Sequence, residues 1–410
     1  MENFTVNLKF NLQFDLQRFA DAVCQIGDTT YTSFTAAITA ASSGDTITML
    51  KDVTDVSSDI SIEKEITLDL NGKTISGKTN GGGIFRITTN GKLIVKDSST
   101  DGTGTIENTE REAATIYNLG GTLEISGGNF KGIGYVIANG EEGGTINING
   151  GVFTGTLYAI YNPSGTLTIS EGTFTSNFYG VVSGGTAEIS GGTFTGGYYA
   201  VVNTGGTVNI SGGTFTGNDS AVSNENNGTV EISGGNFSSQ PDSTWLATDY
   251  GVINSDSTYT VVPAYTKEID GVNVTFLFDS LNVLQSVKVN NEEILDNGTF
   301  TITSTGKTKT YSATLENDTV TETLESATYT KTIESVEVTF TYNGSSVLQN
   351  VTGTSVSYSN DTFTITSTGK VKTYSATLEN DTVTETLQSA VYTKTIESVE
   401  VTFTYNGSSV

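Results

Sequence analysis

Tyrosine is the potential ligand-binding residue with the most regular spacing in this sequence. Four tyrosines recur every 20 to 23 residues: Tyr135, Tyr158, Tyr179 and Tyr199. Pointing outward, their rings would form a flat strip suited to stacking on sugar rings. Each nevertheless shares alternation parity with a neighbouring aliphatic column, which predicts that it points inward or to a corner. We therefore expect an internal tyrosine stack and keep an outward strip as the alternative.

Other aromatic residues fall outside this regular column. Tyr117, Tyr161 and Tyr198 have less regular positions and are candidates for exposure. Trp245, the only tryptophan, comes where the repeat described below ends, and a large aromatic there is suited to covering a last coil. Stacking on a sugar is its alternative role. The sequence thus predicts Tyr161, Tyr198 and Trp245 as candidate ligand contacts.

Carboxylates are the remaining groups that could do chemistry. The chain has no histidine, which excludes a Ser-His-Asp triad and a histidine-based metal site within it. Glu124, Glu188 and Glu231 occupy one outward-facing column of the repeat, where a pair of carboxylates could hydrolyse a glycoside. A solvated face explains the same spacing without catalysis. We therefore predict no catalytic residue and a protein that is not an enzyme.

Calcium is the one cofactor with a candidate loop. The segment between Asp97 and Asp101 supplies oxygen ligands at short spacing, as calcium sites do. It lacks the full EF-hand pattern, and an ordinary turn is the preferred interpretation. We expect no bound cofactor, with calcium at this loop as the alternative.

Composition limits the partners. The 410 residues carry a formal net charge of −26, whereas nucleic acids and anionic membranes attract basic surfaces. The sequence has no apolar span of about 18 residues, so we expect no membrane insertion. The single cysteine, Cys24, rules out an internal disulfide. The N-terminus lacks the basic start and apolar run of a Sec signal peptide, so an extracellular location would need another route.

A repeat of about 21 residues positions these side chains. Its clearest copy is Gly206-Thr-Val-Asn-Ile-Ser-Gly-Gly-Thr-Phe-Thr-Gly217, and related copies run from Thr122 to Phe237. This period, rich in β-branched residues and glycine, predicts a solenoid in which like residues stack about 4.8 Å apart. Aliphatic columns then form the core, and Gly-Gly pairs form turns that a Cβ would obstruct. A polar column forms a side-chain ladder; it comprises Asn139, Asn162, Ser183, Asn203 and Asn224.

The sequence divides into three parts. Residues 1–27 form a leader or arm, either a strand or a flexible segment. Residues 28–265 form the solenoid, where Phe34, Ala37, Ile38 and Ala41 have the spacing of a short helix that caps the first coil. Residues 266–410 hold tandem all-β repeats of about 63 residues with Asn-Gly and Asn-Asp turns. The third copy is truncated, so we expect a fragment of a longer protein.

The first repeat region resembles the pectin-lyase-like family of right-handed parallel β-helices, found in large bacterial surface and adhesin-like proteins and in phage tail spikes. The likeness covers about residues 31–262 and rests on the cap helix, on Gly44-Asp-Thr-Ile-Thr-Met-Leu50 and on Ile66-Thr-Leu-Asp-Leu-Asn-Gly-Lys-Thr-Ile75. Coil lengths of 20 to 23 also favour a right-handed over a left-handed helix, whose coils hold about 18 residues. The resemblance implies fold more than activity. The regular coils contain no arginine to match the base of related pectate lyases, and the Gly-His-Gly segment of polygalacturonases cannot occur.

These observations predict a non-enzymatic, structural or adhesin-like protein that presents an extended β-helix face. We expect it outside the cell, at the cell surface or on a virion, with a glycan or a surface protein as partner and with homo-oligomers allowed. One alternative is a phage tail-spike-like virion protein, possibly trimeric, that binds or degrades glycans. A further alternative is an architectural filament or surface-layer subunit.

Overall fold

A computed structural model describes residues 22–80 and 82–407. The chain is nearly all β, with 63% strand and 3% helix, as predicted. It divides into two units, one ending at Val261 and one beginning at Val262, against the predicted boundary of 265/266. Most of the predicted leader, residues 1–21, lies outside the described residues.

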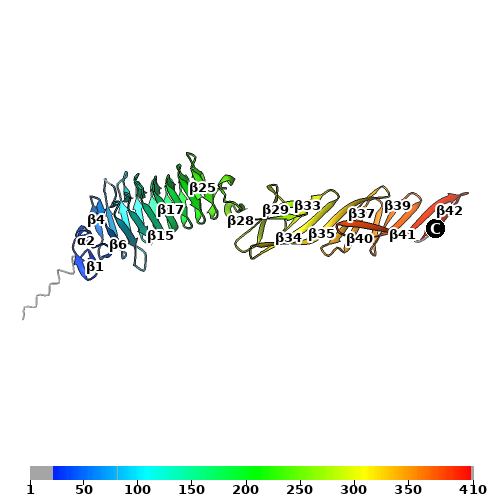
Figure 1. The fold of residues 1–410 in the computed structure, drawn as a ribbon, viewed down its shortest axis with the longest axis horizontal. Helices are drawn as coiled ribbons and strands as arrows, with labels where there is room; N and C mark the ends of the chain where they lie inside the picture. Colours follow the sequence, from blue (N-terminus) through cyan, green and yellow to red (C-terminus); the bar gives the residue numbers. More distant parts are fainter. Residues whose placement is uncertain (1–21, 81, 408–410) are drawn as a thin grey trace, which may run out of the picture. The chain divides into compact units, whose positions relative to one another are not determined.

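The first unit is a β-solenoid of about nine coils whose parallel strands stack in three rows (Figure 1). Row 1 contains β3 (Asp45–Met49), β6 (Glu65–Asp69), β9 (Lys92–Lys96), β12 (Thr122–Ile125), β15 (Thr145–Gly155), β17 (Thr166–Ser176), β19 (Thr186–Ile189), β22 (Thr207–Ile210) and β25 (Thr229–Ile232). Row 2 contains β4 (Val53–Val56), β7 (Thr74–Gly77), β10 (Thr105–Asn108), β13 (Asn129–Gly132), β15, β17, β20 (Thr193–Gly196), β23 (Thr214–Gly217) and β26 (Asn236–Phe237). Row 3 contains β5 (Ile60–Ile62), β8 (Phe85–Ile87), β11 (Ala114–Asn118), β14 (Tyr135–Asn139), β16 (Tyr158–Asn162), β18 (Tyr179–Ser183), β21 (Tyr199–Asn203) and β24 (Ser220–Asn224).

The ends of the solenoid are built from short antiparallel and helical segments. β1 (Cys24–Ile26), within the predicted leader, pairs with β2 (Thr29–Tyr31) and with β3. Helix α2 (Phe34–Ala40) buries Phe34, Ala37 and Ile38 in the core, as its spacing predicts, while its role as a cap stays a prediction. After the last coil come the 3₁₀ turn η1 (Ser243–Trp245) and β27 (Tyr250–Ser255), and β28 (Thr258–Ile269) pairs with β26.

Columns of identical side chains fill the solenoid. The most regular is a fully buried phenylalanine stack whose adjacent ring centroids lie 4.7 to 5.0 Å apart with interplanar angles of 3 to 12°. Its members are Phe130, Phe153, Phe174, Phe194, Phe215 and Phe237. The spacing equals that of neighbouring strands, so each ring sits on the one below at ladder distance. The predicted aliphatic core columns are confirmed as well, since Ile160, Val181 and Val201 are fully buried.

The two glycines of each Gly-Gly pair are required for different steric reasons, as Gly212 and Gly213 show. A Cβ on Gly212 would lie 2.4 Å from the carbonyl oxygen of Ser190 on the preceding coil. Gly213 instead has φ of +108°, a conformation that L side chains rarely adopt. The first glycine thus permits close coil stacking, and the second permits the turn.

The predicted polar ladder is present in row 3 and is almost wholly buried. Side-chain amides donate from Asn118 to Asn139 (2.8 Å), from Asn139 to Asn162 (2.7 Å) and from Asn162 to the Ser183 hydroxyl (3.0 Å). The last rung runs from Asn203 to Asn224 at 3.0 Å. The same amides donate to turn carbonyls, such as that of Gly206, which also accepts the backbone amide of Thr229.

Removing one rung should destabilise the solenoid. Asn162→Ala removes the closer of the two acceptors of the Asn139 amide, so we expect a loss of about 1–3 kcal/mol in the free energy of unfolding. Chemical denaturation followed by circular dichroism measures it. Asn177→Ala, at an exposed turn position of the same coil, is the control and should change stability by less than about 0.5 kcal/mol. Equal effects of the two substitutions would contradict the ladder's role.

The second unit consists of tandem antiparallel sheets, as predicted. The first sheet pairs β28 with β29 (Val272–Phe278), β30 (Leu284–Val289) and β31 (Glu292–Glu293). The next contains β32 (Leu295–Asp296), β33 (Thr299–Ser304), β34 (Lys307–Glu316), β35 (Thr319–Ile333), β36 (Val336–Asn343) and β37 (Leu348–Gly353). The last contains β38 (Val356–Ser359), β39 (Thr362–Ser367), β40 (Lys370–Glu379), β41 (Thr382–Ile396) and β42 (Val399–Tyr405). The predicted Asn-Asp turns, such as Asn380-Asp381, have positive φ at both residues, as tight hairpins require.

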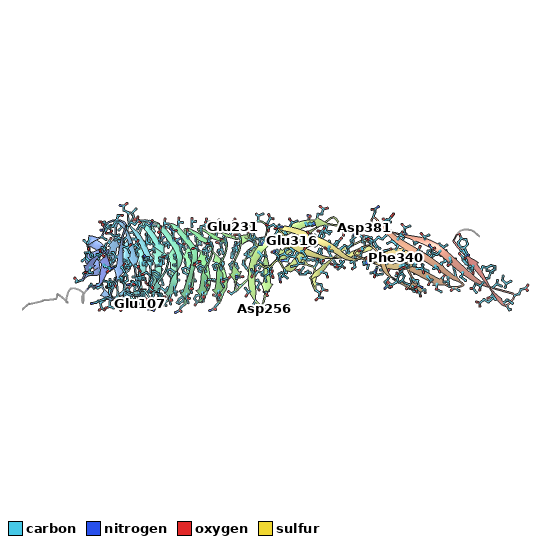
Figure 2. The ribbon with its side chains drawn as sticks, turned by 90° about the horizontal axis from the view of Figure 1, so that it is seen from below. Glu107, Glu231, Asp256, Glu316, Phe340 and Asp381 are labelled. Atoms are coloured by element: carbon cyan, nitrogen blue, oxygen red, sulfur yellow. The ribbon has the colours of Figure 1, made fainter. Side chains whose placement is uncertain are left out.

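Repeated ion pairs join successive sheets within this unit. Lys267 pairs with Glu322, and its counterpart 64 residues on, Lys331, pairs with Glu385. The turn residue Glu334 contacts Lys370 and Lys372, which lower its pKa to about 2 from an ordinary 4.5. Asp381 (Figure 2) contacts Lys309 at 2.7 Å and the Tyr329 hydroxyl at 2.7 Å. Burial alone would raise the pKa of Asp381, but these hydrogen bonds outweigh burial and hold it below the ordinary range.

These pairs predict acid sensitivity of the second unit. Because the pKa of Glu334 is depressed by folding, its contribution is full above about 4.5 and is lost as pH falls toward about 2. Thermal unfolding measured from neutral pH to about pH 3 should show Glu334→Gln less stable at neutral pH and less sensitive to acid than the parent. Glu337→Gln, at a nearby exposed position, should keep the parent's slope. Parallel curves for the parent and Glu334→Gln would refute the assignment.

Candidate functional site

The four regularly spaced tyrosines form an outer corner of row 3. Tyr135, Tyr158, Tyr179 and Tyr199 are half-buried and lie outside the hydrophobic core. Their rings stack face to face, with centroid separations of 5.1, 5.4 and 6.0 Å along the column. The expected internal stack is therefore wrong, and the corner position is the one observed.

The reason is a break in strand alternation. In β16, Ala159 and Ile160 are both fully buried, so Tyr158 and Tyr161 emerge on the same side of the strand. The register pairs Tyr135 with Tyr158 and Ala138 with Tyr161, and this arrangement recurs along the row. A strict period of two would have placed Tyr158 with Ile160. Two consecutive inward residues thus turn a predicted core column into a surface column.

Two predicted ligand contacts extend this column into a broader surface. The Tyr161 ring lies 5.0 Å from Tyr135 and 5.5 Å from Tyr158. Tyr198 is 43% exposed, and its ring lies 6.0 Å from Tyr179. We call this set the aromatic strip; it comprises Tyr135, Tyr158, Tyr161, Phe178, Tyr179, Tyr198 and Tyr199.

The third predicted contact, Trp245, is placed elsewhere. It is half-buried in η1 and packs against the hydrophobic core after the last coil. The residues that follow it hold this segment in place, since the Ala247 amide donates to the Ile232 carbonyl at 2.9 Å. This position matches a residue that covers the last coil.

A hollow of about 330 Å³ opens at one end of the aromatic strip. It lies where one alanine precedes the first tyrosine of a column and another alanine interrupts a second column. Ala114 is paired with Tyr135 on the next coil, and Ala138 lies between Tyr117 and Tyr161. Both alanines are buried, and they line the hollow together with Tyr117, Tyr135 and Tyr161. Glu112 and Glu141, both exposed, also line the hollow.

The hydroxyl groups of Tyr161 and Tyr158 have a raised pKa and are harder to ionise than usual. Burial raises the pKa of Tyr161, and the nearby Tyr135, Glu141 and Tyr117 raise it further. Tyr158 is shifted in the same direction by burial and by the tyrosines around it. These phenols therefore stay neutral at physiological pH and act as hydrogen-bonding and stacking groups.

The hollow was missed in the sequence because its floor is defined by small residues. The signal was present in the coil alignment, where Ala114 and Ala138 stand at positions that neighbouring coils fill with tyrosine. Glu112 and Glu141 follow no column, and only the folded turns bring them to the same opening.

The predicted glutamate column is confirmed by the register of row 1. Glu124, Glu188 and Glu231 share that column, with Asn147, Thr168 and Asn209 between them. Glu231 projects from the outer surface of the solenoid (Figure 2). Glu124 forms an ion pair with Lys92 at 3.1 Å, and Glu188 accepts a hydrogen bond from Asn209 at 2.8 Å.

The loop predicted as a calcium alternative is held by its own backbone. Asp97 accepts hydrogen bonds from the amides of Gly72 (2.8 Å), Ser99 (3.2 Å) and Gly104 (2.7 Å). Burial alone would raise its pKa, but these bonds leave the pKa below the ordinary value. The carboxylate thereby anchors a turn, and calcium at this loop stays a prediction.

Within residues 22–80 and 82–407, no group of three or more His, Cys, Asp or Glu side chains is arranged to hold a metal ion. The same described residues include no helix long and apolar enough to span a membrane. Comparisons with protein-family models, with curated proteins and with solved structures each find no match.

Proposed function

We propose that this chain is a non-enzymatic, adhesin-like surface protein whose solenoid binds a glycan along the aromatic strip. The observation that supports this most strongly is the run of half-exposed rings on successive coils. Aromatic rings offer flat apolar contact area at low entropic cost and leave a hydroxyl for hydrogen bonding. Rings repeated at each coil suit a ligand that is itself a repeating polymer.

The proposal includes a location and a family. A right-handed, pectin-lyase-like β-helix at the cell surface, in the extracellular space or on a virion is consistent with the parallel coils and the acidic chain. The acidic composition also favours neutral or basic glycans over acidic ones, because like charges repel. Homo-oligomers are compatible with this role. In this proposal Trp245 packs against the last coil, and Tyr161 and Tyr198 contact the glycan.

Glycan-array screening of the full chain, followed by titration of the best ligand, tests this proposal. Tyr198→Ala and Tyr161→Ala should each weaken binding about five- to tenfold, since a stacked ring contributes about 1 kcal/mol. Tyr392→Ala is the matched control, because this tyrosine of the second unit is 41% exposed and lies outside the strip. Equal affinity of all three variants for every glycan would refute the strip as the binding surface.

The same experiment separates the tail-spike alternative. Incubation of the bound oligosaccharide with the chain, followed by mass spectrometry, should return the oligosaccharide intact. Shortened products would instead favour a glycan-degrading virion protein.

A further inference from the structure

The hollow at the end of the aromatic strip has a lining that selects a charge. Tyr117, Tyr135 and Tyr161 supply aromatic rings, and buried Ala114 and Ala138 supply an apolar floor. A volume of about 330 Å³ lies within the range of small-ligand sites. The face of an aromatic ring carries partial negative charge and attracts cations within about 6 Å of its centre.

The acidic residues at the opening act in the same direction, although Arg86 lies beside the lining residue Gly82. Glu112 and Glu141 line it, and none of the described residues that line it is a lysine or an arginine. Arg86, which is paired with Tyr117 on the preceding coil, lies 4.0 Å from the carboxylate of Asp59. Rings and carboxylates together favour a cation over a neutral or anionic group.

The shape of the opening limits the size of that cation. Tyr117 and Tyr161 lie on either side of Ala138, two ladder steps or about 9.6 Å apart along the column. A Cβ at Gly140, also in the lining, would lie 2.9 Å from the Tyr117 hydroxyl, so this wall is already closely packed. The space between the rings is therefore suited to one sugar-sized group rather than to a flat polymer face.

From this geometry we infer that the hollow binds a protonated amino group on a sugar, so that the glycan on the strip is an amino-sugar polymer. The inference rests on the proposed glycan binding and adds the ligand class. The ammonium group lies between the tyrosine rings and pairs with the carboxylates of Glu112 and Glu141. The neighbouring sugar units stack on Tyr158, Tyr179 and the rest of the strip.

Titration of the full chain with two matched probes tests this inference. One probe is an oligomer of β-linked glucosamine, and the other is the same oligomer fully N-acetylated, which has no positive charge. At mildly acidic pH, where the amines are protonated, the glucosamine oligomer should bind at least about tenfold more tightly. Glu112→Gln and Glu141→Gln should each reduce that preference, and added salt should weaken it.

A substitution that fills the hollow provides the second arm. Ala138→Tyr places a ring where Tyr117 and Tyr161 already stand in the same column, so the fold accommodates the residue type. It should bring the affinity for the glucosamine oligomer down to that of the acetylated one. Ser223→Tyr is the matched control, since it lies four coils further along this column and outside the hollow, and it should keep the preference.

The outcomes separate this inference from the proposed function. Equal binding of the two probes by the parent chain would overturn the amino-sugar assignment while leaving glycan binding intact. A preference that survives Ala138→Tyr would overturn the hollow as its source. If neither probe nor any arrayed glycan binds, the proposed function falls as well.

Discussion

In-register stacking of coils is the constraint on which the rest of this structure depends. Adjacent strands lie about 4.8 Å apart, so each side chain lies at about that distance from the side chain at the equivalent position of the next coil. Inside the solenoid, phenylalanine ring centroids of neighbouring coils lie 4.7 to 5.0 Å apart, and asparagine side chains of neighbouring coils form hydrogen bonds of 2.7 to 3.0 Å. Glycine satisfies this constraint at the turns, where a Cβ would strike the carbonyl of the coil beneath.

The same constraint produces the candidate site without any dedicated element. A tyrosine column that emerges at a corner must become a continuous strip, because every coil repeats it at the same height. A hollow then needs only a small residue at one rung, as Ala114 and Ala138 show. Departures from the repeat, such as Ala138, therefore create the surface features that distinguish one coil from the next.

The repeating features of the fold could be predicted from the sequence, but the orientation of the tyrosine column could not, because strand alternation breaks there. Period, aliphatic core columns, polar ladder and glycine turns follow from spacing alone, and so do the tandem antiparallel sheets with their Asn-Asp hairpins. A period of two predicted that the tyrosines point inward. This prediction was wrong because two consecutive residues, Ala159 and Ile160, both point inward. The hollow could not be predicted, because Glu112 and Glu141 meet through turns whose paths no local pattern specifies.

The outward orientation of the tyrosine column can be tested by thiol labelling. Cysteines placed singly at positions 158, 159, 160 and 161 would be reacted with a maleimide under native conditions, over the slow background of Cys24, whose burial raises its pKa to about 11. The structure predicts rapid labelling at 158 and 161 and protection at 159 and 160. Rapid labelling at 159 and 161 with protection at 158 and 160 would indicate strict alternation. It would place the column of Tyr158 inside the solenoid and contradict its outward orientation.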